Sequence, residues 1–287
     1  MISIIICSKE QNLNEILSKN IELTINVPYE IILIDNSRNK HSIFSAYNEG
    51  ISRAKYPYLC FIHEDVIFRN NNWGKLLCNA FESDSKIGMI GVIGSAVLFD
   101  IIYGWWDTNA HVGSIIQSQK GDKMSVNYQK NNNILPILSD AVVCDGLFLA
   151  FPKNIFSKIK FDTETYNGFH CYDLDISMQV INSGYKIKVI ENILIEHFST
   201  GNLSKEFINT CLTFSNKWKG NLPITIDRIS AKELKELRDK YILDLLSYKL
   251  RFNNCIDLST SKFWSCIYKS LSPIIKLKNN IKNKIQI

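Results

Sequence analysis

The sequence predicts an α/β fold, with a mostly parallel central sheet and helices on both faces. Short apolar runs alternate with segments of helical periodicity through the first 92 residues. Continuous apolar runs are typical of strands that crossover helices bury on both faces. Beyond Pro223, an apolar stripe through Leu234, Leu237, Tyr241, Leu245 and Tyr248 predicts a helical extension. We therefore divide the chain into residues 1–223, the main α/β domain, and residues 224–287, a basic helical extension.

The individual elements follow from the period of the apolar residues and from turn residues between them. The expected strands are Ile2–Cys7, Glu30–Ile34, Tyr58–Ile62, Ile87–Val92, Ala141–Phe151 (interrupted by Asp145-Gly146), Tyr185–Ile190 and Ile193–Glu196. The expected helices lie around Leu13–Leu17, Ile43–Ala54, Trp73–Phe81 and Tyr172–Asn182, with Gly184 as the stop signal of the last. Residues 99–140 predict loops and short hairpin strands inserted into this pattern.

Composition excludes several classes of protein. The chain has 287 residues, of which 46% are hydrophobic and 21% charged, which predicts a folded core rather than disorder. No run approaches the ~18 apolar residues of a membrane span, and the apolar start lacks the basic leader of a signal peptide. The eight cysteines are scattered without a Cys-x-x-Cys pair, as expected for reduced core residues of a cytoplasmic protein.

Charge is distributed unevenly along the chain. Residues 1–223 carry 20 basic and 22 acidic side chains, whereas residues 224–287 carry 13 and 6. A slightly acidic main domain argues against a nucleic-acid partner. From Lys262 onward, six lysines alternate with aromatic and aliphatic residues, without an acidic residue. This tail predicts either peripheral contact with an anionic membrane or a helix packed on the domain with a solvated lysine face.

The strand Tyr58–Ile62 runs directly into His63, Glu64 and Asp65. In open α/β sheets, ligands bind at the carboxyl ends of the strands. Carboxylates placed there suit Mg²⁺ or Mn²⁺, which fill their other positions with substrate phosphates. The alternative is a solvated loop after an edge strand.

Other segments favour the metal interpretation, because their order resembles that of the inverting family 2 glycosyltransferases with the GT-A fold. The resemblance covers Ile2 to about Gly201 and is strongest for bacterial surface-polysaccharide enzymes. The segments that carry it are Ile34-Asp35-Asn36-Ser37, Ala46-Tyr47-Asn48-Glu49-Gly50-Ile51, His63-Glu64-Asp65, Gly104-Trp105-Trp106, Asp145-Gly146, Phe161-Asp162, Phe169-His170-Cys171-Tyr172-Asp173-Leu174-Asp175, Gly184-Tyr185-Lys186 and His197.

The resemblance implies which residues bind a nucleotide-diphosphate sugar donor. Asp35 would bind the base or ribose, although Asp35-Asn36-Ser37 is also a plain turn sequence. Asn48 matches the family's Asn-x-Gly near the donor, with an ordinary helix-interior position as the alternative. His63 and Glu64 would lie beside the donor, and Glu64, between its two neighbours on extended chain, is expected to face the opposite side.

The metal ligands implied by the resemblance are Asp65 and His197. Asp65 matches the last carboxylate of the family's Asp-x-Asp, in which His63 replaces the first. His197 matches a histidine that completes the metal site or contacts the diphosphate in several relatives, although a lone histidine after a strand is also often structural. The implied cofactor is Mn²⁺ or Mg²⁺.

Asp173 matches the family's general base, which takes the proton of the acceptor hydroxyl. Tyr172 stands where a Glu is more common. Asp173 and Asp175 lie about 200° apart on a helix, so only one of them can face the reaction centre. The alternative for Asp173 is a first-turn acid stabilised by the helix dipole.

Four further residues are candidates for contact with the sugar or acceptor, together with Asp175. Trp105 and Trp106 offer aromatic faces to sugar rings, and we expect one of them to lie in the core. Asp145 could hold a sugar hydroxyl or be a buried turn acid. His170 could contact the acceptor.

Together these features predict a metal-dependent, inverting glycosyltransferase that acts on a glycan or lipid-linked acceptor. The expected location is the cytoplasm, at the inner face of a bacterial membrane. A non-catalytic nucleotide-sugar or glycan-binding module is the alternative, and a metal-dependent phosphodiesterase is a weaker one.

Overall fold

The computed structural model describes residues 1–100, 104–119, 122–125, 135–199 and 204–252. Its core is a seven-stranded sheet in the order β11-β14-β5-β13-β3-β1-β2. The bounds of these strands are β1 Ile2–Ser8, β2 Tyr29–Asp35, β3 Tyr58–Ile62, β5 Ile87–Gly91, β11 Leu138–Ala141, β13 Phe148–Pro152 and β14 Lys186–Ile190. Only β11 and β13 run against the others, so the sheet is mostly parallel, as predicted.

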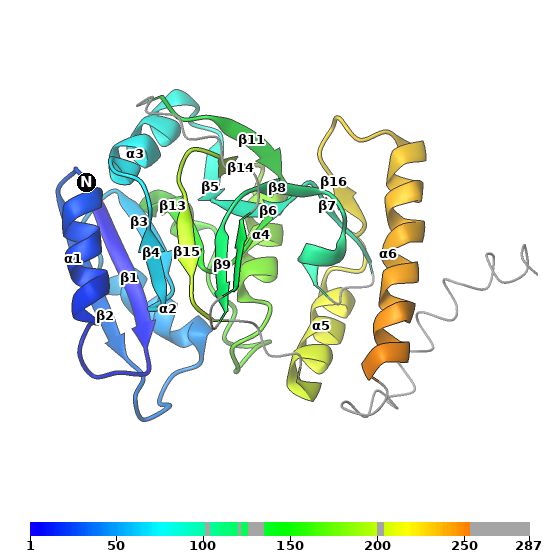
Figure 1. The fold of residues 1–287 in the computed structure, drawn as a ribbon, viewed down its shortest axis with the longest axis horizontal. Coiled ribbons are helices and arrows are strands. Elements are labelled where there is room, and N and C mark those ends of the chain that lie inside the picture. The colour runs from blue at the N-terminus through cyan, green and yellow to red at the C-terminus, as the bar shows by residue number, and fades with distance from the viewer. Residues whose placement is uncertain (101–103, 120–121, 126–134, 200–203, 253–287) are drawn as a thin grey trace, which may run out of the picture.

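Helices cover both faces of this sheet (Figure 1). Their bounds are α1 Glu15–Thr24, α2 Ile43–Arg53, α3 Trp73–Ser83, α4 Tyr172–Asn182, α5 Lys205–Lys217 and α6 Ala231–Phe252. Alternate residues of β1 point to opposite faces: Ile4 and Ile6 join the core under α1 and α3, whereas Ile5 joins the core under α2. The continuous apolar run of β1 is therefore explained by burial on both sides. The fold-class prediction is confirmed.

Short strands form smaller sheets beside the main one. Their bounds are β4 Val66–Phe68, β6 Ile93–Ser95, β7 Val97–Leu98, β8 His111–Gly113, β9 Ile116–Gln119, β10 Asp122–Ser125, β12 Val143–Cys144, β15 Ile195–His197 and β16 Ile224–Thr225. One sheet has the order β10-β9-β15-β4 and another the order β12-β6-β8. Two short 3₁₀ helices, Trp105–Asp107 and Lys153–Ser157, complete the secondary structure of the described residues.

Most predicted elements are found near their expected bounds. Tyr172–Asn182 is helical over the whole predicted range, and Gly184 follows it with a φ of +80° that a glycine adopts without strain. The predicted strand Ala141–Phe151 is interrupted at Asp145-Gly146, as expected. It is divided between β12 and β13, because the chain turns at Asp145-Gly146 and passes from one sheet to another. Helix α5 was not expected from the sequence.

The C-terminal segment packs on the rest of the molecule as far as the structure describes it. Strand β16 pairs with β7, and Arg238 of α6 forms an ion pair with Asp100 at 2.9 Å. Tyr241 is buried against Phe99, with ring centroids 5.0 Å apart. The division at residue 223 stays a prediction. The side chains of Leu245 and Tyr248, and the basic tail from Lys262, lie outside the described residues.

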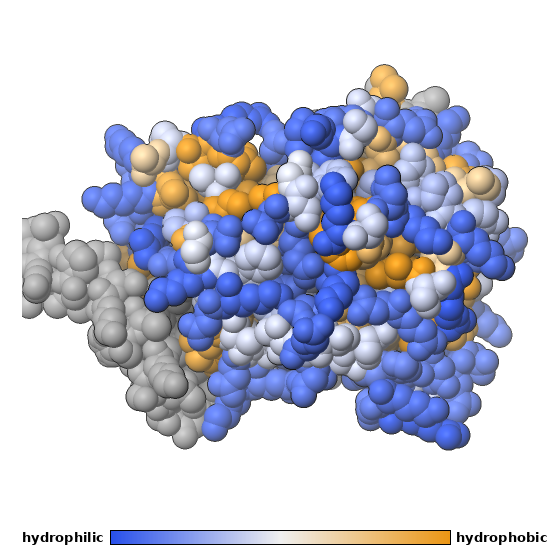
Figure 2. Space-filling view, turned by 180° about the vertical axis from the view of Figure 1, so that it is seen from behind, coloured by the Kyte–Doolittle hydropathy of each residue, from blue (hydrophilic) through white to orange (hydrophobic). Residues whose placement is uncertain are grey.

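Seen from the side opposite to Figure 1, the surface is largely hydrophilic, with hydrophobic residues visible between the polar ones (Figure 2). None of the described helices is both long enough and apolar enough to span a bilayer.

Candidate active site

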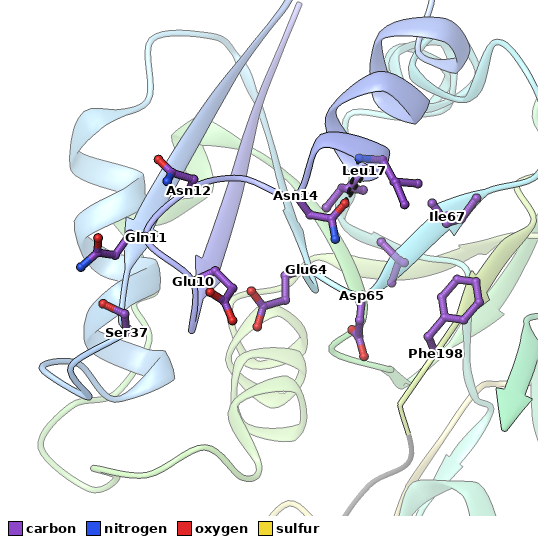
Figure 3. Close-up of a pocket in the computed structure, with 12 residues that line it drawn as sticks. Glu10, Gln11, Asn12, Asn14, Leu17, Ser37, Glu64, Asp65, Ile67 and Phe198 are labelled. Carbon is purple, nitrogen blue, oxygen red and sulfur yellow. Dashed lines mark hydrogen bonds between the residues drawn. The ribbon is translucent and has the colours of Figure 1, made fainter. Parts of the chain in front are cut away.

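Two cavities border the residues that follow β3: Glu64 and Asp65 line the first, and His63 lines the second. The first has a volume of about 960 Å³ and lies between the ends of β1 and β3 and the start of α1. Glu10, Gln11, Asn12, Ser37, Glu64 and Asp65 are among its lining residues (Figure 3). The second has a volume of about 540 Å³ and is lined mainly by aromatic and histidine side chains. Its lining residues include His63, Trp105, Trp106, Asp145, Phe169, His170, Tyr172, Asp173, His197 and Phe207.

The pairing of two short strands brings Asp65 and His197 together. In the antiparallel pair β4–β15, His197 lies opposite Val66, the residue after Asp65. The backbone N–H of Phe198 also donates to the carbonyl of Asp65 at 3.1 Å. His63 is two residues before Asp65, at the end of β3. Segments 134 residues apart therefore converge on one point.

Three side chains form a compact triangle at this point. His63 Nδ1 lies 3.4 Å from His197 Nε2, and Asp65 Oδ1 lies 3.9 Å from the first atom and 3.5 Å from the second. Ligands at about 2.0–2.2 Å from one metal ion lie roughly 3–3.5 Å from each other. Two of the three distances lie in this range and the third is longer, so a small shift of one side chain would let all three ligate a single cation. Metal ligation was expected of Asp65 and His197, but not of His63.

The protonation states suit this use. Burial raises the pKa of Asp65, but the neighbouring His197, Ser199 and His63 together outweigh burial, so its pKa lies below the ordinary value. Burial and the neighbouring His197 lower the pKa of His63, against an opposing effect of nearby carboxylates. At neutral pH the site therefore offers an ionised carboxylate and an uncharged His63. Two imidazoles and one carboxylate, with open positions beside them, suit a divalent first-row transition metal.

Glu64 faces away from the triangle, as its position on extended chain predicts. Its carboxylate accepts hydrogen bonds from Ser8 Oγ and from the backbone N–H of Lys9, at 3.3 Å for the latter. It therefore fixes the end of β1 against the end of β3 and contributes an acidic group to the wall of the first cavity.

Asp173 lies in the first turn of α4 and lines the second cavity. Burial, and then the negative charge of Asp145, raise its pKa to about 7, against backbone N–H groups that include that of Gly146. A carboxylate with a pKa near neutrality accepts a proton more readily than an ordinary one, as a general base must. Asp145, His170, Trp105 and Trp106 line the same cavity. Their contact with a sugar or acceptor stays a prediction.

Of the two tryptophans, Trp105 is only 4% exposed and Trp106 is 38% exposed, so the expectation that one lies in the core is confirmed. Trp106 stacks on Phe207 with ring centroids 5.9 Å apart, and His170 meets Phe207 edge-on at 5.3 Å. Phe169, at 52% exposure, adds an accessible ring. These rings give the second cavity an aromatic wall.

Three predicted residues do not line either cavity. Asp175 is 1% exposed and bonded on the opposite face of α4, where its carboxylate accepts from Trp218 Nε1 at 2.8 Å. Asn48 Nδ2 donates to the carbonyl of Phe161 at 2.7 Å, and Asn48 Oδ1 accepts from the backbone N–H of Phe161 at 3.1 Å. This side chain therefore has a structural role. Asp35 is exposed at the end of β2, where it accepts from the backbone N–H of Ser37 at 2.9 Å.

Several lining residues were missed in the sequence. Tyr172, Phe169 and Cys171 flank Asp173 and could have been found by proximity. Phe207 lies on α5, whose sequence signals were Ser204 as the N-cap and the spacing of Phe207, Cys211 and Phe214. Gln117 carried no signal, because its place beside His197 depends on the pairing of β9 with β15.

No curated protein sequence matches this chain. Two solved structures that resemble it are described as "Crystal structure of GalNAc-T7 with UDP, GalNAc and Mn2+" and "Crystal Structure of A197 from STIV". The first is 11% identical, with a TM-score of 0.49, covering 88% of this chain and 57% of the other, so this chain spans little more than half of the GalNAc-T7 length. The second is 12% identical, with a TM-score of 0.39, covering 69% of this chain and 86% of the other. Residues 3–214 match the model of the family described as "Glycosyltransferase like family". The protein therefore belongs to the glycosyltransferase-like family.

Proposed function

We propose that this glycosyltransferase moves a hexose from a nucleotide-diphosphate donor to a hydroxyl of a glycan or lipid-linked acceptor, with inversion and with the help of Mn²⁺ or Mg²⁺. The observation that carries the proposal is that one cavity is lined both by His63 and His197, two members of the cation-binding triangle, and by Asp173, a carboxylate of raised pKa. Synthesis of a bacterial surface polysaccharide, by an enzyme at the inner membrane face, is the expected setting.

The first cavity suits the nucleotide. Its carboxylate and amide groups can accept or donate hydrogen bonds to a ribose or a base. Among the described residues that line the two cavities there is no Lys or Arg. In this proposal, the positive charge that a diphosphate requires comes from a cation that His63, Asp65 and His197 would hold. When bound, such a cation neutralises the charge that develops on the departing diphosphate.

The second cavity suits the sugar and the acceptor. Its aromatic wall offers flat apolar surfaces to the C–H faces of sugar rings, while Asp145 and His170 offer hydrogen bonds to hydroxyl groups. Asp173 would remove the proton from the attacking hydroxyl as that oxygen bonds to the anomeric carbon. The diphosphate leaves from the opposite face of the ring, and this single displacement inverts the configuration.

The donor set favours Mn²⁺ over Mg²⁺, because imidazole nitrogens are better ligands for first-row transition metals than for the harder Mg²⁺. A test compares nucleotide-diphosphate sugars, each with Mn²⁺, Mg²⁺ or chelator, for hydrolysis and for thermal stabilisation of the full chain. We expect one donor to stabilise the protein in a Mn²⁺-dependent manner and to be slowly hydrolysed.

In the same assay, Asp65→Ala should abolish Mn²⁺-dependent donor binding. The matched control is Asp84→Ala, which removes an exposed carboxylate paired with Lys186 on the surface. Donor affinity that is equal with and without Mn²⁺ in the native protein would contradict the metal assignment. Donor binding without hydrolysis or transfer to any acceptor would instead favour a non-catalytic nucleotide-sugar-binding module.

A further inference from the structure

The two histidines of the triangle each have a second ring nitrogen, and each of these outer nitrogens contacts one polar side chain. Gln117 lies beside His197, because β9 and β15 pair in parallel with these two residues in register. The amide Oε1 of Gln117 is 3.2 Å from His197 Nδ1. On the other histidine, the hydroxyl of Tyr172 is 2.7 Å from His63 Nε2.

The orientation of the Gln117 amide is fixed by its other hydrogen bonds. Its Nε2 donates to the carbonyl of Ser199 at 2.6 Å and to that of His197 at 3.2 Å. The flipped amide would place Oε1 against two carbonyl oxygens, with no proton between them. Oε1 must therefore face His197 Nδ1 and accept a hydrogen from it. His197 is thereby held as the Nδ1–H tautomer, with the lone pair of Nε2 directed at Asp65 and His63.

The position of the Tyr172 side chain is also fixed, in this case by packing. It is buried, with its ring edge-on to Phe44 and Tyr47 at centroid distances of 6.4 and 5.6 Å. Residue 146 has to be glycine for the hydroxyl to reach His63, because a Cβ there would lie 2.0 Å from the Tyr172 oxygen. A hydroxyl can donate or accept. It can therefore accept the Nε2–H of His63 whenever the Nδ1 lone pair is used by a cation.

We propose that Gln117 and Tyr172 are positioning residues of the cation site, each holding the outer nitrogen of one histidine so that the lone pair of the inner nitrogen faces the cation. This inference rests on the proposed function, because it presumes that the triangle binds a cation. Partners that orient metal-ligating histidines in this way typically change metal affinity by about 10–100-fold when they are removed.

The test measures Mn²⁺ affinity of the full chain by titration, with free Mn²⁺ read from its paramagnetic resonance signal. We expect Gln117→Leu to weaken binding by about 10–100-fold and Tyr172→Phe by about 10-fold. Gln117→Glu should stay within about threefold of the native affinity, because a carboxylate also accepts the Nδ1–H of His197. Thermal melting in the absence of metal identifies any variant that fails to fold.

Two control variants match these changes away from the site. Gln179→Leu removes a glutamine that bonds the Lys160 carbonyl and Asp175, and Tyr58→Phe removes a hydroxyl from a ring stacked on Phe81. Both should bind Mn²⁺ with native affinity. If Gln117→Leu and Gln179→Leu weakened Mn²⁺ binding equally, a general loss of structure would explain the effect, and the proposal would be overturned.

A second measurement depends on neither metal nor activity. The chain has five histidines, so long-range ¹H–¹⁵N spectra of the metal-free protein can resolve the tautomer of each. We expect His197 as the Nδ1–H tautomer in the native protein and a loss of that preference in Gln117→Leu. An Nε2–H tautomer of native His197, or native Mn²⁺ affinity in Gln117→Leu, would overturn the proposal. Failure of the native protein to bind Mn²⁺ is a distinct result that contradicts the metal assignment itself.

Discussion

Two aspartates on opposite faces of α4, Asp173 and Asp175, lie in different electrostatic environments. Asp173 faces the second cavity, where burial and Asp145 raise its pKa to about 7. Asp175, two residues later, accepts hydrogen bonds from Tyr166 Oη at 3.3 Å, Trp218 Nε1 at 2.8 Å and Gln179 Nε2 at 2.7 Å. It also forms an ion pair with Lys217 at 2.7 Å.

The difference teaches what makes a carboxylate available for chemistry. Donors surround the oxygens of Asp175, so that residue stabilises the packing of α5 on α4. Asp173 is buried near Asp145 instead, and both burial and the charge of Asp145 destabilise its ionised form. Uptake of a proton relieves this destabilisation. The 200° separation that follows from helix geometry places the two residues in these different environments. The following predictions test this contrast.

The largest effect is expected for Asp173→Asn. The amide keeps the size of the side chain but cannot accept a proton, so transfer should fall by about 10²-fold or more. Donor binding should change little, because the base acts on the acceptor. Steady-state rates and donor calorimetry on the same protein separate the two effects, and near-native turnover would exclude Asp173 as the base.

Asp175→Asn should act on stability instead. It removes a buried charge that accepts three hydrogen bonds and one of the two ion pairs of Lys217, which keeps its pair with Asp162, so the free energy of unfolding should fall by about 2 kcal/mol. Activity per folded molecule should be nearly native. Urea unfolding and active-site-normalised rates measure the two quantities. A loss of turnover without a loss of stability would reverse the assignments of the two aspartates.

The third prediction concerns pH. Because the charge of Asp145 raises the pKa of Asp173, Asp145→Asn should lower that pKa. Asp173 then stays ionised at lower pH, and the acidic limb of the rate profile should move down by about one pH unit. The profile of the native protein, with its acidic limb near pH 7, is the reference. An unchanged limb would mean that another group controls it.

The smallest effect is a gain in stability for Asp173→Asn at high pH. The pKa of Asp173 is raised to about 7 in the folded protein, well above its ordinary value, so the ionised group destabilises the fold increasingly as pH rises from about 4 to about 7. The variant lacks this effect and should be more stable than the native protein by about 1 kcal/mol at pH 8, a value reduced for solvent access to the cavity. At pH 4 the two should be equal. Thermal melts at both pH values decide the matter.

The sequence revealed those parts of the fold and site that depend on local pattern. Buried strands show as apolar runs, and a ligand-bearing strand end shows as His63 and Asp65 directly after such a run. Asp173 was expected to face the reaction centre because it matches the general base of the family that the sequence resembles. The pattern could not separate the environments of Asp173 and Asp175, because these depend on Trp218 and Lys217, more than 40 residues away.

Long-range contacts also explain the other misses. Asn48 looked like a donor contact, but the backbone of Phe161 uses its amide. Gln117 has no local feature that distinguishes it from a loop residue, and only the register of β9 against β15 brings it to His197. The fold class was therefore accessible from the sequence, whereas the residues that orient the site were not.

The two ends of helix α5 contact different parts of the molecule. Its first turn contributes Phe207 to the second cavity, while Lys217 and Trp218, at its other end, are attached to the buried Asp175. Substitutions near Phe207 can therefore alter the wall of the cavity without releasing the helix from its attachment. The lining of the second cavity and the attachment of α5 to α4 therefore depend on different turns of one helix.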